Sequence, residues 1–403
     1  MDINALRKEL DSSQHIYLYG AGLTGINYLQ RFRRYLPSRA IESIIVSERK
    51  GNPEKIGGLD VVLLSELSVQ KETAFFWITA GAKHQKEMIQ KLEEIGYNKY
   101  LVPTQEILEK LYMLEKYEFI DRRTFQDKVL FVLAGYKEFL WKDVFERLEK
   151  YIPKDIEVCI LSSGRKIDRL AEIAEKNKWS YLSTTYNSVT MIQNIAMEYY
   201  QQAQWFYKVD EDIFLTEGTL ESMMRTFITV PKLEPCNVGV VAPLIPLNGY
   251  GYIRVLDKLG LRDKYEKLFD KVLSGGYPDK KIESDVKAAA FMWGATEEMP
   301  RLDELNRKFG NSHKYTFCNV RFSIGCILYN REFWDKMGGA YPYGTSLSGD
   351  VGEDEVHLCA RTILKSYTLV VDESSVVGHF SFGAQTEGMK DYYVARHELF
   401  EIQ

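Results

Sequence analysis

Short hydrophobic segments alternate with segments of helical periodicity along most of the chain, and this alternation predicts the fold class. In the first part of the sequence, the apolar segments are 15–19, 41–47, 74–79 and 98–102. Residues 26–36 and 83–95 lie between them, and the i, i+4 spacing of apolar residues in 83–95 is typical of a helix with one buried face. Strands that alternate with helices favour a parallel sheet covered by helices. We therefore expect a small α/β domain with a parallel sheet over residues 1–120.

A second series of the same kind begins after the charged segment YEFIDRRTFQDK, which has the composition of a linker. The predicted strands are 128–134, 156–161, 205–209, 321–329 and 367–371, and a further apolar segment covers 237–245. The predicted helices are 139–151, 166–178, 189–202, 217–228 and 331–337. Residues 247–312 are rich in Gly and charged residues and fit no repeat. We expect a second α/β domain over residues 121–403.

Composition narrows the class of protein. A chain of 403 residues with 45 % hydrophobic residues can bury a sizeable core in two or three domains. A net charge of −5 argues against general nucleic-acid binding, which needs a basic face. Five scattered cysteines without a Cys-x-x-Cys pair indicate a reducing compartment rather than a disulfide framework or zinc site. No signal peptide and no apolar segment of about 18–20 residues is recognisable, so we expect a cytoplasmic protein.

An acidic segment, Asp210-Glu211-Asp212, directly follows the hydrophobic strand predicted at 205–209. Ligands of open α/β sheets bind at the carboxyl ends of strands. Two carboxylates at i and i+2 can hold Mg²⁺ or Mn²⁺, which take oxygen ligands and leave positions for a diphosphate. Such a cation would offset the charge developing on a leaving nucleoside diphosphate. The alternative is a solvated acidic turn that caps the following helix, a common role for an isolated D-x-D.

A second group of polar residues lies in GEDEVHLCARTILKSYTLVVDESSVVGHFSFG, residues 352–383. Glu353 and Asp354 begin a predicted helix, where the helix amides favour carboxylates. His379 ends a strand-like segment. A carboxylate near a diphosphate sugar could remove the proton of an attacking hydroxyl, and a neutral imidazole could be a metal ligand. Taken singly, the two acids indicate only a helix start, and His379 only a structural histidine.

Together, and in this order, these segments resemble the inverting family 2 glycosyltransferases and their relatives of the GT-A fold. The resemblance is carried by D-E-D, SIGCILYNREFWDKMGG, GEDEVHLCAR and VVGH. It implies a metal-dependent enzyme that moves a sugar from a nucleoside-diphosphate sugar to a hydroxyl of a glycan or lipid-linked acceptor in surface polysaccharide biosynthesis. The reaction implied is one in-line displacement at the anomeric carbon, which depends largely on positioning the two substrates.

The resemblance also implies roles for individual residues. Asp210 and Asp212 match the residues that bind the Mn²⁺ or Mg²⁺ ion and the diphosphate, and His379 matches the third metal ligand of some members. Asp354 matches the catalytic base, and Glu353 would support acceptor binding.

Two strand ends depart from the family pattern. Ala134 and Gly135 follow the first strand of the second domain in place of P-x-Y/F-N, and Ser162 lies where members have an Asp that contacts the nucleobase. We expect Ala134, Gly135 and Ser162 to contact the donor, whose base and sugar the resemblance does not identify. We expect 247–312 to be an insertion that shapes the acceptor side.

The N-terminal segment YGAGLTG places Gly20, Gly22 and Gly25 between a strand and a helix, the context of a nucleotide-binding glycine loop. Glycines let a backbone approach a phosphate, and a helix N-terminus attracts its charge. With GNPEKIGGLDVVLLSEL, this part resembles the small Rossmann-like domain fused to some bacterial sugar acyltransferases and other polysaccharide enzymes, which implies nucleotide or nucleotide-sugar binding. The alternative is a module for assembly or acceptor presentation, in which the glycines serve only the tight turn.

Other hypotheses stay open for the whole protein. The glycine loop also allows an NAD-dependent sugar-nucleotide oxidoreductase or epimerase, although the first domain has no Tyr-x-x-x-Lys motif. A non-catalytic nucleotide-sugar-binding protein is a third possibility. Arg31, Arg33, Arg34 and Arg39 form either a patch for anionic lipid head groups or a pyrophosphate-linked acceptor, with peripheral contact to the inner face of the membrane, or a solvated helix face. The oligomeric state is not predicted.

Overall fold

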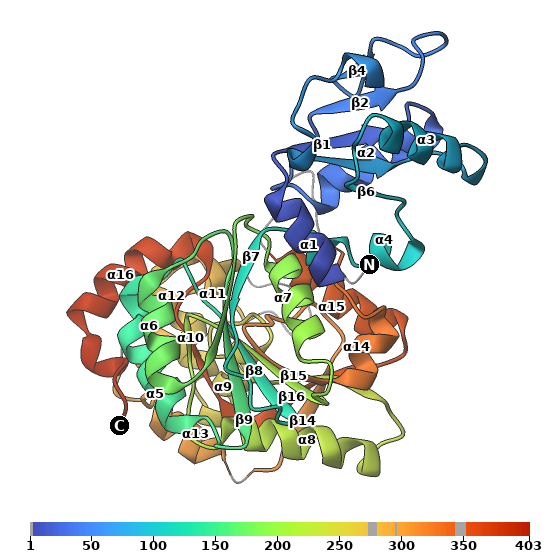
Figure 1. Ribbon diagram of the computed structural model, residues 1–403. Coiled ribbons are helices and arrows are strands. Elements are labelled where there is room, and N and C mark those ends of the chain that lie inside the picture. Colours follow the sequence, from blue (N-terminus) through green and yellow to red (C-terminus); the bar gives the residue numbers. More distant parts are fainter. Residues whose placement is uncertain (1–2, 273–279, 295, 311, 343–351) are drawn as a thin grey trace. The chain divides into compact units, whose positions relative to one another are not determined.

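The structure is a computed structural model, and it describes residues 3–272, 280–294, 296–310, 312–342 and 352–403. The predicted α/β class is confirmed, because helices alternate with strands that pair largely in parallel. The described residues form two compact units. The first consists mainly of the chain up to Glu118, and the second mainly of the chain from Phe119 onward (Figure 1). No helix in the described ranges is both long and apolar enough to cross a bilayer.

The first unit is built on a six-stranded sheet. Its strands, in spatial order, are β3 (Lys55–Ile56), β4 (Leu59–Leu63), β2 (Ser43–Val46), β1 (His15–Tyr19), β5 (Ala74–Ile78) and β6 (Tyr100–Leu101). Neighbouring strands are parallel except for the β3–β4 hairpin. Its helices are α1 (Ile3–Ser12), α2 (Leu23–Tyr35), α3 (Ala82–Glu94) and α4 (Gln105–Glu109). All four strands predicted in this part are present; the first has the predicted bounds and the other three are shorter.

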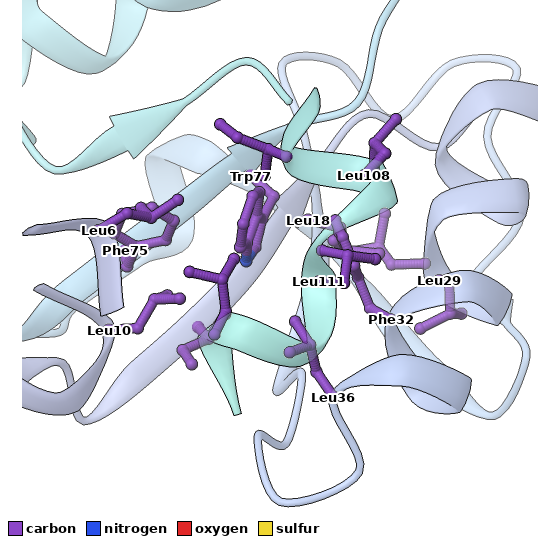
Figure 2. Close-up of a cluster of buried hydrophobic side chains, with 14 of the residues drawn as sticks. Leu6, Leu10, Leu18, Leu29, Phe32, Leu36, Phe75, Trp77, Leu108 and Leu111 are labelled. Atoms are coloured by element: carbon purple, nitrogen blue, oxygen red, sulfur yellow. The ribbon is translucent and has the colours of Figure 1, made fainter. Parts of the chain in front are cut away.

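Side chains of the first sheet alternate between two buried clusters, as the two-residue period of a strand requires. On one face, Leu18 and Trp77 pack with Leu6 of α1 and Phe32 of α2 (Figure 2). On the other face, the neighbouring positions of β1 and β5 pack with Leu92 of α3. Both faces of the sheet are therefore covered.

The second unit contains a nine-stranded mixed sheet within the described residues. Its spatial order is β14 (Tyr315–Cys318), β16 (Thr368–Val376), β13 (Val238–Leu244), β15 (Cys326–Asn330), β11 (Trp205–Asp210), β8 (Lys128–Leu133), β9 (Ile156–Ser162), β10 (Ser180–Thr184) and β7 (Tyr117–Ile120). Strands β11, β8 and β9 run parallel, whereas β15 is antiparallel to both of its neighbours. The edge strand β7 occupies the start of the expected linker, because YEFI has high strand propensity.

Helices cover this sheet and fill the segment expected to be an insertion. They are α5 (Trp141–Tyr151), α6 (Asp168–Asn177), α8 (Thr219–Leu233), α9 (Gly251–Leu259), α10 (Arg262–Leu268), α11 (Lys280–Ser284), α12 (Val286–Met292), α13 (Leu302–Phe309), α14 (Arg331–Met337), α15 (Glu353–Leu364) and α16 (Thr386–Ala395). Helix α7 (Val189–Tyr199) begins within the first unit, and its last residues belong to the second. Helix α8 packs on β13 and β16, and α13 and α15 also contact β16. A separate two-stranded ribbon joins β12 (Ile213–Phe214) to β17 (Gly378–His379).

A buried ion pair joins α5 to α13 and to the C-terminal segment. Arg147 Nη1 lies 2.8 Å from Asp303 Oδ1, and Arg147 Nη2 lies 3.0 Å from Asp303 Oδ2. The same guanidinium donates to the carbonyl oxygens of Phe400 and Glu401, at 3.2 and 3.0 Å. A charge with no exposed surface needs such partners, so Arg147 fixes three distant segments of the second unit together.

Candidate functional site

The acidic segment lies at the carboxyl end of β11, in the middle of the large sheet. The backbone amide of Asp210 donates to Gly325 O at 2.8 Å, just before β15. The amide of Glu211 donates to Leu133 O at 2.9 Å, at the end of β8. The neighbouring strands on both sides therefore fix the direction in which these acids leave the sheet.

Glu211, the middle acid, binds backbone amides of the loop that follows β8. Its carboxylate accepts hydrogen bonds from Gly135 N at 2.9 Å, Tyr136 N at 2.8 Å and Trp141 Nε1 at 2.6 Å. Glu211 is 7 % exposed, and these three donors account for both of its oxygens. Its role is thus to shape the loop, and Asp210 and Asp212 are left for other partners.

Asp212 lies between two basic side chains. Lys137 Nζ forms an ion pair with Asp212 Oδ2, and His379 Nε2 lies 3.2 Å from the same oxygen. Burial opposes ionisation, but His379 and Lys137 outweigh it and hold the pKa of the Asp212 carboxyl below its ordinary value. Asp212 is therefore an ionised carboxylate at neutral pH.

Lys208 connects Asp210 with Asp354. This buried lysine of β11 places Nζ 2.7 Å from Asp210 Oδ1 and 4.0 Å from Asp354 Oδ2, and donates to Ile324 O at 3.0 Å. Burial raises the pKa of the Asp210 carboxyl to about 6, against the opposing charge of Lys208 and with the help of Asp212. One ammonium group thus lies between the acid predicted to bind metal and the acid predicted to be the base.

Asp354 lies in the first turn of α15 and is 6 % exposed, and its carboxylate accepts a hydrogen bond from Glu355 N at 2.9 Å. Glu353 precedes it at the start of the helix and is half-buried. The left-handed backbone of Gly352 (φ 100°) lets the chain enter the helix here.

The residues expected to contact the donor lie at the ends of β8 and β9. Ala134 N donates to Leu161 O at 3.0 Å, which joins the two strand ends. The Ser162 hydroxyl is buried and lacks a hydrogen-bond partner in the described structure. A Cβ added to Gly135 would lie 3.2 Å from that hydroxyl. The absence of a side chain at Gly135 therefore keeps the space in front of Ser162 free, close to the loop that Glu211 holds.

Tyr136 continues the same loop. Its hydroxyl donates to Ser163 O at 2.8 Å, and the Arg165 guanidinium lies 4.0 Å from the centroid of its ring. The ring remains 52 % exposed. An exposed aromatic ring with a cation on one face is thus held beside the ends of β8 and β9.

In the glycine loop of the first unit, the backbone requires glycine at two positions but not at the third. A Cβ on Gly25 would lie 2.0 Å from Gly20 O, and Gly20 itself has φ 128°, so both glycines are required by the backbone. Gly22 caps α2 without a side-chain hydrogen bond, and a Cβ there would meet nothing within 4 Å. The fold of the loop therefore explains Gly20 and Gly25, but not Gly22.

Arg39 does not belong to the predicted basic patch. It is 5 % exposed, it pairs with Asp11 at 2.6 Å, and its Nε donates to Leu114 O. Arg31 donates to Leu108 O at 2.7 Å. Arg31 holds α2, and Arg39 holds the segment after α2, to neighbouring parts of the first unit, so the patch is reduced to Arg33 and Arg34.

The donor types around Asp212 suit a divalent cation, since carboxylate oxygens and an imidazole bind Mn²⁺. His379 Nδ1 is also buried without a hydrogen-bond partner in the described structure. Yet among the described residues no three His, Cys, Asp or Glu side chains are close enough together to hold a metal ion. Lys137 supplies a positive charge to Asp212 instead. Asp210, Asp212 and His379 are thus chemically suited to a cation, and Lys137 would have to leave Asp212 to admit one.

Sequence reasoning missed Lys137 and Lys208. A lysine inside the apolar strand WFYKV was the available signal for Lys208, because lysine is seldom fully buried unless it is paired. For Lys137 there was no comparable signal, since its partner Asp212 is far away in the chain and follows a different strand.

No protein-family model matches the sequence, and no curated protein matches it either. Similar solved structures include a mannosyltransferase from Pyrobaculum calidifontis in complex with GDP-Man and Mn²⁺, at 13 % identity and a TM-score of 0.38, covering 72 % of this chain and 68 % of that one. A cytidylyltransferase from Leptospira borgpetersenii is 18 % identical with a TM-score of 0.23, over 29 % of this chain and 53 % of its own. This chain therefore spans about half the length of the cytidylyltransferase. At these identities and TM-scores, neither structure identifies the function.

Proposed function

We propose that the chain is an inverting glycosyltransferase of the GT-A fold that moves a sugar from a nucleoside-diphosphate sugar to an acceptor hydroxyl. The observation that carries the proposal is the position of Lys208 between Asp210 and Asp354. Lys208 Nζ lies 2.7 Å from Asp210, the acid that would hold the cation of the donor's diphosphate, and 4.0 Å from Asp354, the acid that would remove the proton. Group transfer needs donor binding and proton removal at one centre, and this pair of acids would provide both.

In this reaction Asp354 accepts the proton of the acceptor hydroxyl. The hydroxyl oxygen forms a bond to the anomeric carbon while the bond from that carbon to the diphosphate oxygen breaks. The bonding electrons leave with the nucleoside diphosphate, and Asp354 ends the step protonated. Glu353, beside Asp354 in the first turn of α15, would bind the acceptor.

The leaving diphosphate carries the negative charge that the site must balance. Asp210, Asp212 and His379 would hold a Mn²⁺ or Mg²⁺ ion, which supplies electrostatic stabilisation of the leaving group. Lys137, released from Asp212, would then be free to bind a phosphate oxygen. The backbone of Ala134 and Gly135 and the hydroxyl of Ser162 would contact the nucleoside part of the donor.

The remaining parts of the chain would serve binding. The acceptor would be a glycan or a lipid-linked glycan of surface polysaccharide assembly, and residues 247–312 would shape the site that receives it. The glycine loop with Gly20, Gly22 and Gly25 would bind a nucleotide or nucleotide sugar in a separate domain over residues 1–120. Such an enzyme would act in the cytoplasm, peripherally at the membrane where its acceptor is lipid-linked.

The first test is donor binding, measured by thermal shift with UDP-, GDP-, CMP- and dTDP-sugars in the presence of Mn²⁺. We expect one nucleotide class to raise the midpoint of unfolding, because a ligand that binds only the native state stabilises it. An Asp354→Asn variant should keep this shift and lose transfer by about 10²–10⁴-fold.

Asp335→Asn, at an exposed position of α14, is the matched control and should keep full activity. Most of the activity remaining in the Asp354→Asn variant would exclude Asp354 as the base. If none of the four nucleotide classes raised the midpoint, the proposal of a nucleotide-sugar donor would fail.

A further inference from the structure

A hollow lies in the second unit, away from the acidic site. It has a volume of about 250 Å³ and is lined by Arg123, Phe125, Gln126, Glu198, Tyr199, Tyr200, Gln201, Gln202 and Ala203. These residues precede β8 and β11 in the chain, whereas Asp210 ends β11 and Gly135 follows β8. Six strand residues span about 20 Å, so the hollow lies at the amino ends of these two strands, opposite the acidic site. We call it the Phe125 cleft.

Phe125 is held in an unusual backbone conformation that exposes its ring. Its φ of 61° is in the left-handed region, which is unfavourable for a bulky side chain. The amides on either side, Thr124 N and Gln126 N, both donate to Glu157, at 2.6 and 3.1 Å. Glu157 is buried in β9 and imposes the turn, so the Phe125 ring stays 63 % exposed. Strain that the surrounding structure maintains, together with an exposed aromatic ring, is typical of a binding position.

Two arginines fix the wall of the cleft formed by the end of α7 and the segment after it. Arg123 donates to Tyr199 O, and its guanidinium lies 5.1 Å from the Phe125 ring centroid. Arg331 donates to Tyr200 O at 2.7 Å and to Ala203 O at 3.3 Å. These bonds satisfy carbonyl groups at the end of a helix, which prefer cations. The cleft is therefore formed before any ligand arrives.

The lining carries no surplus of positive charge, because its arginine is paired with an acid and Glu198 is itself an acid. Arg123 pairs with Asp121 at 2.6 Å, and Glu198 accepts a hydrogen bond from Gln201 Nε2 at 2.9 Å. The other polar groups are side-chain amides, which both donate and accept. A phosphate would find no surplus of positive charge here.

We infer that the Phe125 cleft binds a neutral pyranose, a single sugar unit of a glycan. The exposed ring offers an apolar surface to the C–H face of the sugar, while the amides of Gln126, Gln201 and Gln202 match its hydroxyl groups. The volume exceeds that of several water molecules, at about 30 Å³ each, and is below the range of roughly 300–1,000 Å³ typical of drug-sized ligands. This site goes beyond the proposed transfer reaction and needs neither donor nor metal.

Saturation-transfer NMR with the unmodified chain tests the inference, with methyl glycosides of glucose, galactose, mannose and N-acetylglucosamine as probes and without nucleotide or metal. We expect signals from at least one glycoside, strongest for the protons of its apolar face. Phe125→Ala should weaken binding about tenfold or more, as loss of a central aromatic contact does. Phe317→Ala, at an exposed phenylalanine outside the cleft (38 % exposed), should leave binding unchanged.

Phe125→Gly separates binding from folding. Glycine accepts a positive φ, so this variant should unfold at the same or a higher temperature while it loses the glycoside signals. Two controls complete the test. If the Asp354→Asn variant lost binding equally, the sugar would occupy the acidic site. If the chain bound inorganic phosphate or N-acetyltyrosine amide in preference to the glycosides, the cleft would serve another ligand class. Either result overturns the inference. Because no donor is present, failure here leaves the proposed transferase activity untouched.

Discussion

His379 Nε2 lies 3.2 Å from Asp212 Oδ2, although the two residues come from distant parts of the chain. The β12–β17 ribbon causes this proximity, since Ile213 pairs with His379 and Phe380 N donates to Asp212 O at 2.9 Å. The backbone therefore fixes the imidazole against the acid. Lys137, which reaches Asp212 from a loop, is the partner that can leave.

Replacing Lys137 by Met should increase the affinity of the protein for Mn²⁺. The substitution removes the positive charge that competes for Asp212, and we expect a gain of about tenfold, which corresponds to about 1.4 kcal/mol. Free Mn²⁺ can be measured by electron paramagnetic resonance in the absence of nucleotide. Lys142→Met, at an exposed position of α5, is the control. Unchanged affinity in the Lys137 variant would mean that the cation does not bind at Asp212.

Gly25→Ala should destabilise the first unit, whereas Gly22→Ala should not. The new Cβ at position 25 would overlap Gly20 O, and relief requires movement of the backbone, at a cost of about 1–3 kcal/mol. Position 22 has an ordinary φ of −73° and open space. Hydrogen exchange of the amides in β1 and α2 measures the effect within this unit. Equal protection in both variants would contradict the packing role of Gly25.

Arg147→Met should lower the free energy of unfolding by about 3–5 kcal/mol, because it leaves Asp303 buried without its partner. Arg169→Met, at an exposed ion pair with Glu138, should cost no more than about 1 kcal/mol. Urea denaturation compares the two. A double variant, Arg147→Met with Asp303→Leu, should recover part of the loss; failure to recover any would assign the effect to packing rather than to the unpaired charge.

Glu115 should make the stability of the first unit depend on pH. Burial raises the pKa of its carboxyl, although the amides of Ser38 and Lys116 and the charge of Arg39 oppose the shift. The folded state thus favours the protonated form. The stability that the protonated Glu115 carboxyl gives to the folded state is fully present below the ordinary pKa of 4.5. It is lost as the pH rises through the higher pKa of the folded state.

Urea unfolding between pH 4 and about 7, compared for the wild-type chain and Glu115→Gln, measures this contribution. The variant should lose less stability than the wild type as the pH rises. Glu106→Gln, at an exposed position of α4, should follow the wild type. Parallel curves for all three proteins would contradict the assignment.

The elements with a strong local pattern could be predicted from the sequence. The helix expected at 331–337 has those bounds in the structure, and the strand at 15–19 likewise. Strand β4 and strand β10 were missed, because five apolar or small residues without clear alternation are not distinctive. The antiparallel insertion of β15 between β11 and β13 also depends on long-range pairing that no local pattern encodes.

At the site, the order of the motifs led to the expectation that Asp210 and Asp354 act together, and Lys208 lies between them in the structure. The different partners of Glu211 and Asp212 within the acidic segment could not be predicted from the sequence. Glu211 and Asp212 are neighbours with the same charge, and distant segments distinguish them. The loop after β8 brings backbone amides to Glu211 and Lys137 to Asp212, and the β12–β17 ribbon brings His379 to Asp212.

Glu211 also affects how substitutions in this region should be understood. Since its carboxylate holds the backbone at Gly135 and Tyr136, a change at position 211 would alter the loop after β8 without removing any group that we propose to react. In a scan of variants, inactivity at this position would resemble the loss of a catalytic acid. Only a probe of the loop itself, such as the accessibility of Tyr136, would reveal that the damage is to the shape of the site.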